Sequence, residues 1–160
     1  MEAPRFPFLV PALLAAAACS PAVPPYVPGL GEIMTVVQMR HAKLWLSGRA
    51  GNWRAAAYEL DELDESLAAA VLYHPVHKDM PRPVSELVPE MMDGPVRDLR
   101  RAVAAEDGAA FATAFDSLTA ACNSCHETAT FAFNVVVRPE TNPFPSQDFR
   151  PPAAAAEATG

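Results

Sequence analysis

The distribution of proline constrains the fold of this chain more than any other feature of its sequence. The 160 residues include 17 prolines, but none lies between Gly29 and His74 and none lies between Val96 and Arg138. Proline removes a backbone hydrogen-bond donor, and its ring clashes with the preceding turn of a helix. Long helices therefore belong in these two windows, and the pattern predicts a helical protein.

Hydrophobic periodicity and capping residues divide the chain into four expected helices. They span 30–47, 53–73, 85–105 with an interruption near 93–95, and a fourth segment that begins after Asp107. Asn52 and Asp107 are good N-caps for the second and fourth helices. No stretch shows the sustained alternation of a strand. Because the connections are short, we predict an all-α, antiparallel up-down four-helix bundle.

Composition divides the chain into four parts. They are a signal peptide or lipoprotein signal at 1–19, a proline-rich linker at 20–29, a four-helix domain at 30–138, and a proline-rich tail at 139–160 that is expected to be loose. The apolar run at 6–18 is too short to span a membrane and has the length of a signal-peptide core. The sequence therefore predicts an exported protein.

Two cleavage sites are compatible with this signal. The run Ala16-Ala17-Ala18-Cys19 resembles a lipoprotein box, whose cleavage would leave Cys19 as a lipidated N-terminus attached to a membrane. The box has Ala16 at the position where leucine is usual. Ordinary cleavage nearby is the alternative, and it would remove Cys19 or leave it without a role.

Close to the C-terminus the chain reads Cys122-Asn123-Ser124-Cys125-His126, which is the C-x-x-C-H pattern of c-type haem attachment. Two thiols at this spacing can each form a thioether to a haem vinyl group, and the adjacent imidazole can reach the iron from the same side. A redox disulfide would need a thioredoxin-like βαβ context, which is absent from the sequence. A zinc site would need further ligands that converge on these three residues. The motif therefore predicts one covalent haem c.

Four helices with this motif near the end of the last one resemble the class II cytochromes c, the cytochrome c′-like group. The resemblance covers roughly residues 30–130, and the chain continues for longer after His126 than is usual in that family, which suggests a divergent branch. The resemblance implies that Cys122 and Cys125 form the thioethers and that His126 is the proximal axial ligand. It also implies a homodimer, because such bundles often dimerise through their first two helices.

The distal axial position is assigned to Met34, with His41 as the alternative. Both lie on the apolar face of the first helix. Counting about 1.5 Å per residue from the end that the first and fourth helices share, Met34 lies nearer the level of His126 than His41 does. The resemblance implies a first-helix residue, often Met or aliphatic, beside the distal face. Met34 is expected to be the sixth ligand or a distal lid, with a core methionine as the other interpretation, and His41 would reach the iron only if the helix slid by two turns.

Other charged and aromatic segments have expected places around the haem. Arg40 and Arg49 are candidates for pairing with the propionates, and the acidic run at 59–65 is expected to form a solvated face. His74 and His77 are expected at the surface near the haem edge, with ligation of the iron from there as the alternative. The segment 134–150 is expected to form a strap over that edge, with a clamp onto a partner as the alternative.

These features together favour an exported single-electron carrier located in the periplasm or another extracytoplasmic compartment. The formal net charge of −7 argues against nucleic acid as a partner and favours redox proteins with basic docking surfaces. No catalytic constellation is visible, so an enzyme is not expected. The alternatives are a haem protein that binds or senses NO or CO, and a haem-bearing accessory subunit of a larger redox complex.

Overall fold

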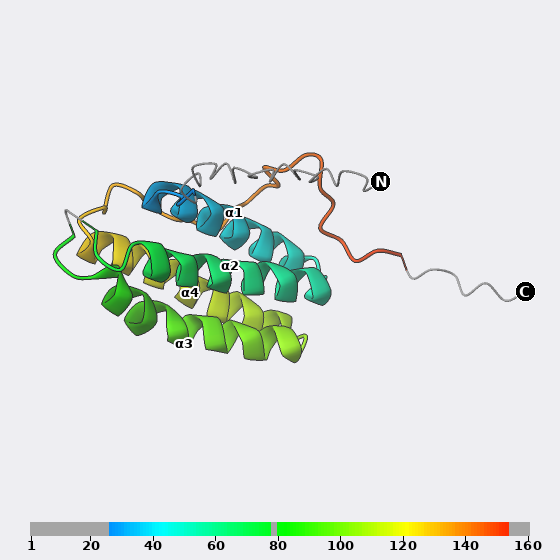
Figure 1. The fold of residues 1–160 in the computed structure, drawn as a ribbon. Helices are drawn as coiled ribbons and strands as arrows, with labels where there is room; N and C mark the ends of the chain where they lie inside the picture. Colours follow the sequence, from blue (N-terminus) through cyan, green and yellow to red (C-terminus); the bar gives the residue numbers. More distant parts are fainter. Residues whose placement is uncertain (1–25, 78–79, 154–160) are drawn as a thin grey trace, which may run out of the picture.

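In a computed structural model, which describes residues 26–77 and 80–153, four helices pack against each other (Figure 1). Helix α1 spans Leu30–Arg49, α2 spans Trp53–Tyr73, α3 spans Val84–Ala104 and α4 spans Gly108–Thr128. Within the two described ranges the chain forms no strand. None of the helices there has the length and apolar character needed to cross a membrane. The expected all-helical, four-helix class is confirmed, whereas the signal segment 1–19 with Cys19, and the last residues of the tail, lie outside the described residues.

Both predicted N-caps are present. The Asn52 side chain accepts a hydrogen bond from the Ala55 N–H at 3.2 Å. The Asp107 carboxylate accepts from the N–H groups of Ala109 and Ala110, both at 3.0 Å. These bonds satisfy backbone donors that the first turn of a helix leaves without a partner, so the starts of α2 and α4 are defined by local chemistry.

Three helices end in the same way, with a residue in the left-handed backbone conformation. These residues are Gly51 after α1, Glu106 after α3 and Thr130 after α4, with φ angles of 71°, 53° and 67°. In each case the N–H of the following residue donates to a carbonyl five residues earlier, as in Asn52 to Ser47, Asp107 to Ala102 and Phe131 to His126. This is the Schellman stop, which reverses the chain within a few residues. A β-branched residue such as Thr130 is strained there, whereas glycine is not.

The expected interruption of the third helix near 93–95 is wrong. Helix α3 runs without a break, with Pro89 and Pro95 inside it. Each proline removes one hydrogen bond of the helix. The helix continues because one face packs into the core over its whole length, through the buried residues Val84, Leu87, Met92, Val96, Leu99, Ala102 and Val103.

An aromatic cluster holds together the end of the bundle that contains the α1–α2 and α3–α4 turns. The Phe111 ring lies 6.0 Å from the ring of Trp45 and 5.8 Å from that of Trp53, measured between centroids. Helix α1 approaches so closely that a Cβ atom on Gly48 would lie 2.2 Å from the Phe111 ring. Over their whole length α1 and α4 are nevertheless the least extensively packed of the neighbouring helix pairs. The contact of Gly48 with Phe111 is therefore a local close approach between two helices that otherwise share few contacts.

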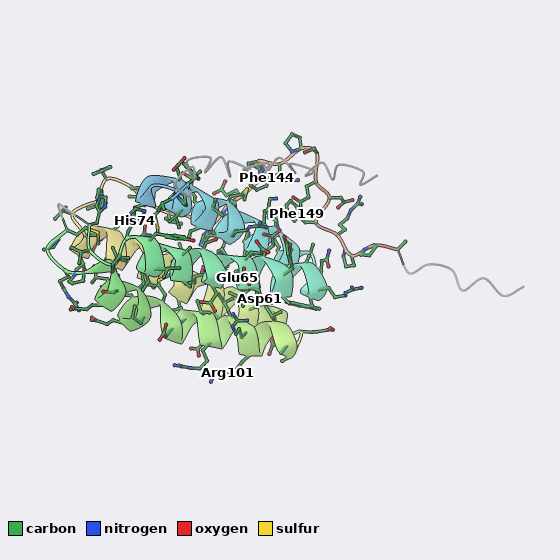
Figure 2. The ribbon with its side chains drawn as sticks, in the orientation of Figure 1. Asp61, Glu65, His74, Arg101, Phe144 and Phe149 are labelled. Atoms are coloured by element: carbon green, nitrogen blue, oxygen red, sulfur yellow. The ribbon has the colours of Figure 1, made fainter. Side chains whose placement is uncertain are left out.

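The first part of the C-terminal tail packs on the bundle and does not behave as the loose tail expected. Phe149 is buried in the core, and Phe144 packs against it. In Figure 2 both side chains lie over α1, while His74 lies at the opposite end of the bundle. The Arg150 carbonyl accepts a hydrogen bond from the Asn52 side chain at 3.2 Å. Residues 139–150 thus cover the end of α1 that is distant from the C-x-x-C-H motif.

The two arginines expected near the propionates have other partners. Arg49 donates to the backbone carbonyl of Glu140 at 3.3 Å. Arg40 donates to the carboxylates of Glu59 at 3.0 Å and Glu62 at 2.9 Å, and the Glu59 side chain is only 5% exposed. Because Glu59 is buried, the acidic run of α2 is not simply a solvated face. It joins α2 to α1.

The same acidic run also joins α2 to α3. Arg100 donates to the carboxylates of Asp61 and Asp64, and all three side chains are largely exposed. Exposed ion pairs of this kind contribute little free energy, whereas a buried carboxylate needs its partner.

We expect Gly48→Ala to lower the free energy of unfolding by about 2 kcal/mol or more, because the added methyl group must displace the Phe111 ring or separate α1 from α4. Chemical denaturation would measure the change. Gly108→Ala is the matched control, since nothing lies within 4 Å of its Cβ position, and it should change stability by less than about 0.5 kcal/mol. Equal effects of the two substitutions would contradict the close approach.

We expect Arg40→Met to cost about 3 kcal/mol of stability, because it leaves the buried Glu59 carboxylate without its cation. Adding Glu59→Gln to this variant should restore much of the loss, as a double-mutant cycle would show. Arg100→Met is the control, because its ion pairs are exposed, and it should cost less than about 1 kcal/mol. A similar loss from Arg100→Met would indicate that burial does not distinguish the two arginines.

Candidate functional site

A cleft of about 310 Å³ opens at the end of the bundle opposite the aromatic cluster. It lies between the first half of α1, the α2–α3 connector, the start of α3 and the end of α4. The described residues that line it are Leu30, Gly31, Met34, Thr35, Gln38, His77, Met80, Val84, Leu87, Val88, Cys125, His126, Ala129, Phe131 and Asn134. A smaller cavity of about 70 Å³ shares Met34, Cys125 and His126 with the cleft and extends to Cys122 and His41. The motif therefore borders two adjoining and mostly apolar spaces.

The last two turns of α4 carry all three chemical groups of the motif. Cys122 is buried and Cys125 is half-buried, and neither forms a disulfide. Residues three apart on a helix lie on the same face, one turn from each other. Both cysteines and His126 border the smaller cavity, although the sequence alone specified only their order.

The environment keeps both thiols neutral. Burial raises the pKa of Cys122 to about 12, with a smaller contribution from the neighbouring Cys125. Burial also raises the pKa of Cys125. A nucleophilic or redox-active cysteine has a lowered pKa and partial exposure, so this pair lacks the properties of a redox dithiol. An apolar setting of this kind suits uncharged sulfur, such as a thiol or a thioether.

The imidazole of His126 is held by the backbone of the segment that follows α4. Its Nδ1 lies 2.6 Å from the carbonyl oxygen of Asn134. A carbonyl can only accept, so Nδ1 carries the proton and the lone pair is on Nε2, the nitrogen that can bind a metal. An imidazole fixed in this way has a defined tautomer and orientation before any ligand binds.

Met34 and His41 occupy different surroundings. Met34 is half-buried and borders both the cleft and the smaller cavity, together with His126. His41 is 2% exposed, with its Nε2 2.8 Å from the Thr119 hydroxyl oxygen and its ring 4.4 Å from that of Phe115. The Thr119 hydroxyl donates to the Phe115 carbonyl, so it accepts from the His41 Nε2–H. His41 is thus anchored in the core, and it borders only the smaller cavity.

The structure adds detail to the cleft that the sequence does not show, although His77 does lie where the sequence analysis expects it, beside the motif. His77 and Met80 line the cleft from the α2–α3 connector, and Asn134 supplies the carbonyl that holds His126. The connector is joined to the linker by His74, whose Nε2 lies 2.8 Å from the Pro28 carbonyl oxygen. These contacts join segments distant in sequence, and no local pattern signals them.

The described residues that line the cleft include no Lys or Arg. In 26–77 and 80–153, no three His, Cys, Asp or Glu side chains converge as ligands of a metal ion would. The zinc alternative therefore gains no support from the surroundings of the motif.

Comparison with known proteins adds no assignment. No protein-family model, no curated protein and no solved structure matches this chain. The interpretation of the site rests on its own residues and geometry.

We expect stability to fall as the pH is lowered from about 6.5 to 4, in part because of His41. Burial lowers the pKa of His41 to about 4. Between these pH values the unfolded chain binds a proton that the folded protein does not, so the free energy of unfolding decreases by on the order of 3 kcal/mol, and this contribution is complete above the window.

Denaturation at a series of pH values would compare the wild type with His41→Gln, which cannot titrate but keeps a donor for Thr119. The variant should show a shallower decrease over this window. The same slope in both proteins would contradict a neutral, buried His41.

Proposed function

We propose that this protein is an exported monohaem c-type cytochrome of the class II, cytochrome c′-like kind, and that it carries single electrons. The observation that carries the proposal is the convergence of two neutral thiols and one oriented imidazole on the smaller cavity and the adjoining apolar cleft. Cys122 and Cys125 are the proposed thioether residues, and His126 is the proposed proximal ligand. Met34 is the proposed distal residue, because it borders the same two spaces as His126.

The chemistry of the lining residues suits a covalent haem, and the cleft is large enough to be a cofactor site. The cleft volume of about 310 Å³ lies within the range of roughly 300–1,000 Å³ for sites of small molecules and cofactors. Its walls are mainly aliphatic and aromatic, and its polar groups are few. When bound, haem c supplies a one-electron iron couple whose potential the axial ligands and the surrounding dielectric adjust.

The chain's own contribution is to bind, orient and exclude water. The two cysteines provide a tether on one face of α4. The Asn134 carbonyl accepts the hydrogen bond from Nδ1 of His126, which leaves the unprotonated Nε2 available to bind the metal.

The proposal includes an antiparallel arrangement of the four helices. Phe111 near the start of α4 contacts Trp45 near the end of α1 and Trp53 at the start of α2. The cleft in turn joins the start of α1, the start of α3 and the end of α4. Alternating directions of consecutive helices account for both sets of contacts.

Proposed partners are redox proteins with basic surfaces, in an extracytoplasmic compartment. The net charge of −7 favours such partners. The segment that follows the motif carries the exposed side chains of Phe133, Val135 and Val137, which would give a partner an apolar contact beside His126. Membrane attachment through Cys19 remains a separate proposal, which mass spectrometry of the mature N-terminus would test.

Covalent attachment is tested by producing the full chain in a bacterium that exports it and attaches haem c. We expect a denatured sample to keep a haem signal and a mass increase of one haem. Replacing both Cys122 and Cys125 by alanine should abolish the signal, and Ser124→Ala should keep it, because Ser124 is exposed on the same turn. A wild-type protein without covalent haem would overturn the proposed function.

The distal ligand is tested by optical spectra of the ferric and ferrous protein. We expect a low-spin ferric spectrum with the weak long-wavelength band of methionine coordination, and its loss in Met34→Ala. Met80→Ala is the matched control, because Met80 borders the same cleft, and His41→Gln is the second control. Loss of the band in a control but not in Met34→Ala would overturn the assignment. A high-spin spectrum that carbon monoxide shifts would instead favour a gas-binding protein.

A further inference from the structure

We propose that Asn123 is a positioning residue for His126, and that it acts by clamping the segment 131–138, here called the strap, against α4. The inference rests on the proposed function of His126 as an axial ligand. Asn123 is the first variable residue of the C-x-x-C-H motif, a position that the attachment chemistry leaves free. The structure gives this position a task that the motif itself does not require.

The amide of Asn123 pairs with both backbone groups of one strap residue. Its Nδ2 donates to the Val136 carbonyl oxygen at 2.9 Å, and its Oδ1 accepts from the Val136 N–H at 2.8 Å. These two bonds imitate the pairing between adjacent strands. They fix the distance and the rotation of residue 136 relative to α4, which a single hydrogen bond would not do.

The clamped residue lies two positions after the carbonyl that holds the imidazole. Asn134 O is 2.6 Å from His126 Nδ1, and His126 lies one helical turn after Asn123. On the other side of Asn134, its own N–H donates to the Phe131 carbonyl at 2.8 Å, directly after the helix stop at Thr130. The carbonyl of Asn134 is therefore held between a turn on one side and the Asn123 clamp on the other.

A second anchor ends the strap and directs the tail away. Arg138 pairs with the carboxylate of Asp116, and its guanidinium lies 4.1 Å from the ring centroid of Trp45. This anchor is four residues beyond Asn134 and on the far side of Val136, so it restrains the end of the strap without fixing the carbonyl itself. Apart from His126 itself, Asn123 is the α4 side chain that bonds the strap nearest to Asn134.

Loosening the clamp should weaken the hydrogen bond from His126 Nδ1 to the Asn134 carbonyl. A carbonyl partner raises the basicity of a ligating imidazole, and a more basic ligand favours the oxidised metal. Without the clamp the reduced form gains relative stability. We expect Asn123→Ala to raise the ratio of reduced to oxidised protein at a fixed ambient potential by threefold or more, which is about 30 mV at about 59 mV per tenfold for one electron.

The experiment uses the full-length protein with attached haem and compares three variants. Asn123→Ala removes both bonds to Val136, and Asn123→Gln keeps an amide one methylene further out and should shift the potential less. Ser124→Ala is the matched control, because Ser124 is exposed on the same turn, and it should leave the potential unchanged. Redox titration gives the first measurement. The second measurement is the rate at which the His126 Nδ1 proton exchanges with solvent, observed by NMR in the ferrous protein. Carbon monoxide is added where the iron is high-spin. We expect this exchange to be at least tenfold faster in Asn123→Ala.

The outcomes separate this inference from the proposed function. A shift of potential with faster proton exchange in Asn123→Ala, absent in Ser124→Ala, supports the positioning role. Haem attached to all variants with unchanged potential and exchange overturns it and leaves the cytochrome intact. If Asn123→Ala does not accumulate with haem, the same two measurements on Asn123→Gln and Ser124→Ala decide the question. A wild type that carries no haem overturns the proposed function instead.

Discussion

The hydrogen bond between His126 Nδ1 and the Asn134 carbonyl, 2.6 Å long, depends on how α4 ends. Thr130 adopts the left-handed conformation, with φ of 67°, and the Phe131 N–H donates back to the His126 carbonyl. The chain therefore reverses within one turn of the motif and returns alongside it. A glycine would make this reversal without strain, so a β-branched residue here stores conformational energy beside the site, as strained residues commonly do. The surrounding contacts, among them the two bonds of Asn123 to Val136, hold the reversal in place.

The two ends of the bundle differ in how closely α1 and α4 are packed. At the end with the helix turns, Phe111 fills the space against Trp45 and Trp53, and the lack of a side chain on Gly48 lets α1 approach its ring. At the other end the same two helices leave the cleft beside Met34 and His126. The aromatic cluster and the buried Arg40–Glu59 pair hold α1 in place through residues that do not line the cleft.

Local chemistry explains which parts of this structure the sequence could predict. The caps Asn52 and Asp107 act on backbone within three residues, and the helices they start were placed correctly. The prediction of a break in α3 was wrong, because burial along the whole helix outweighs the local effect of its prolines. The sequence also did not predict the burial of Phe149 or the ion pair of Arg40. Each depends on a surface that exists only in the folded bundle. At the site, counting along helices brought Met34 toward His126, and both border one cleft, but the assignment of Met34 as an iron ligand stays a prediction.

The strap connects the proposed ligand to the proposed partner surface. Side chains of an extended chain alternate in direction, and in the strap Val136 borders the smaller cavity while Val135 and Val137 are 65% and 67% exposed. The segment whose backbone holds His126 is thus the segment that presents apolar side chains to solvent. On the proposed function, a redox partner that covers these side chains would press on the same backbone that orients the imidazole, and it would restrict the motion of the Asn134 carbonyl. Docking and the electronic state of the ligand would then be linked through a few bonds, with Asn123 as the fixed point on α4.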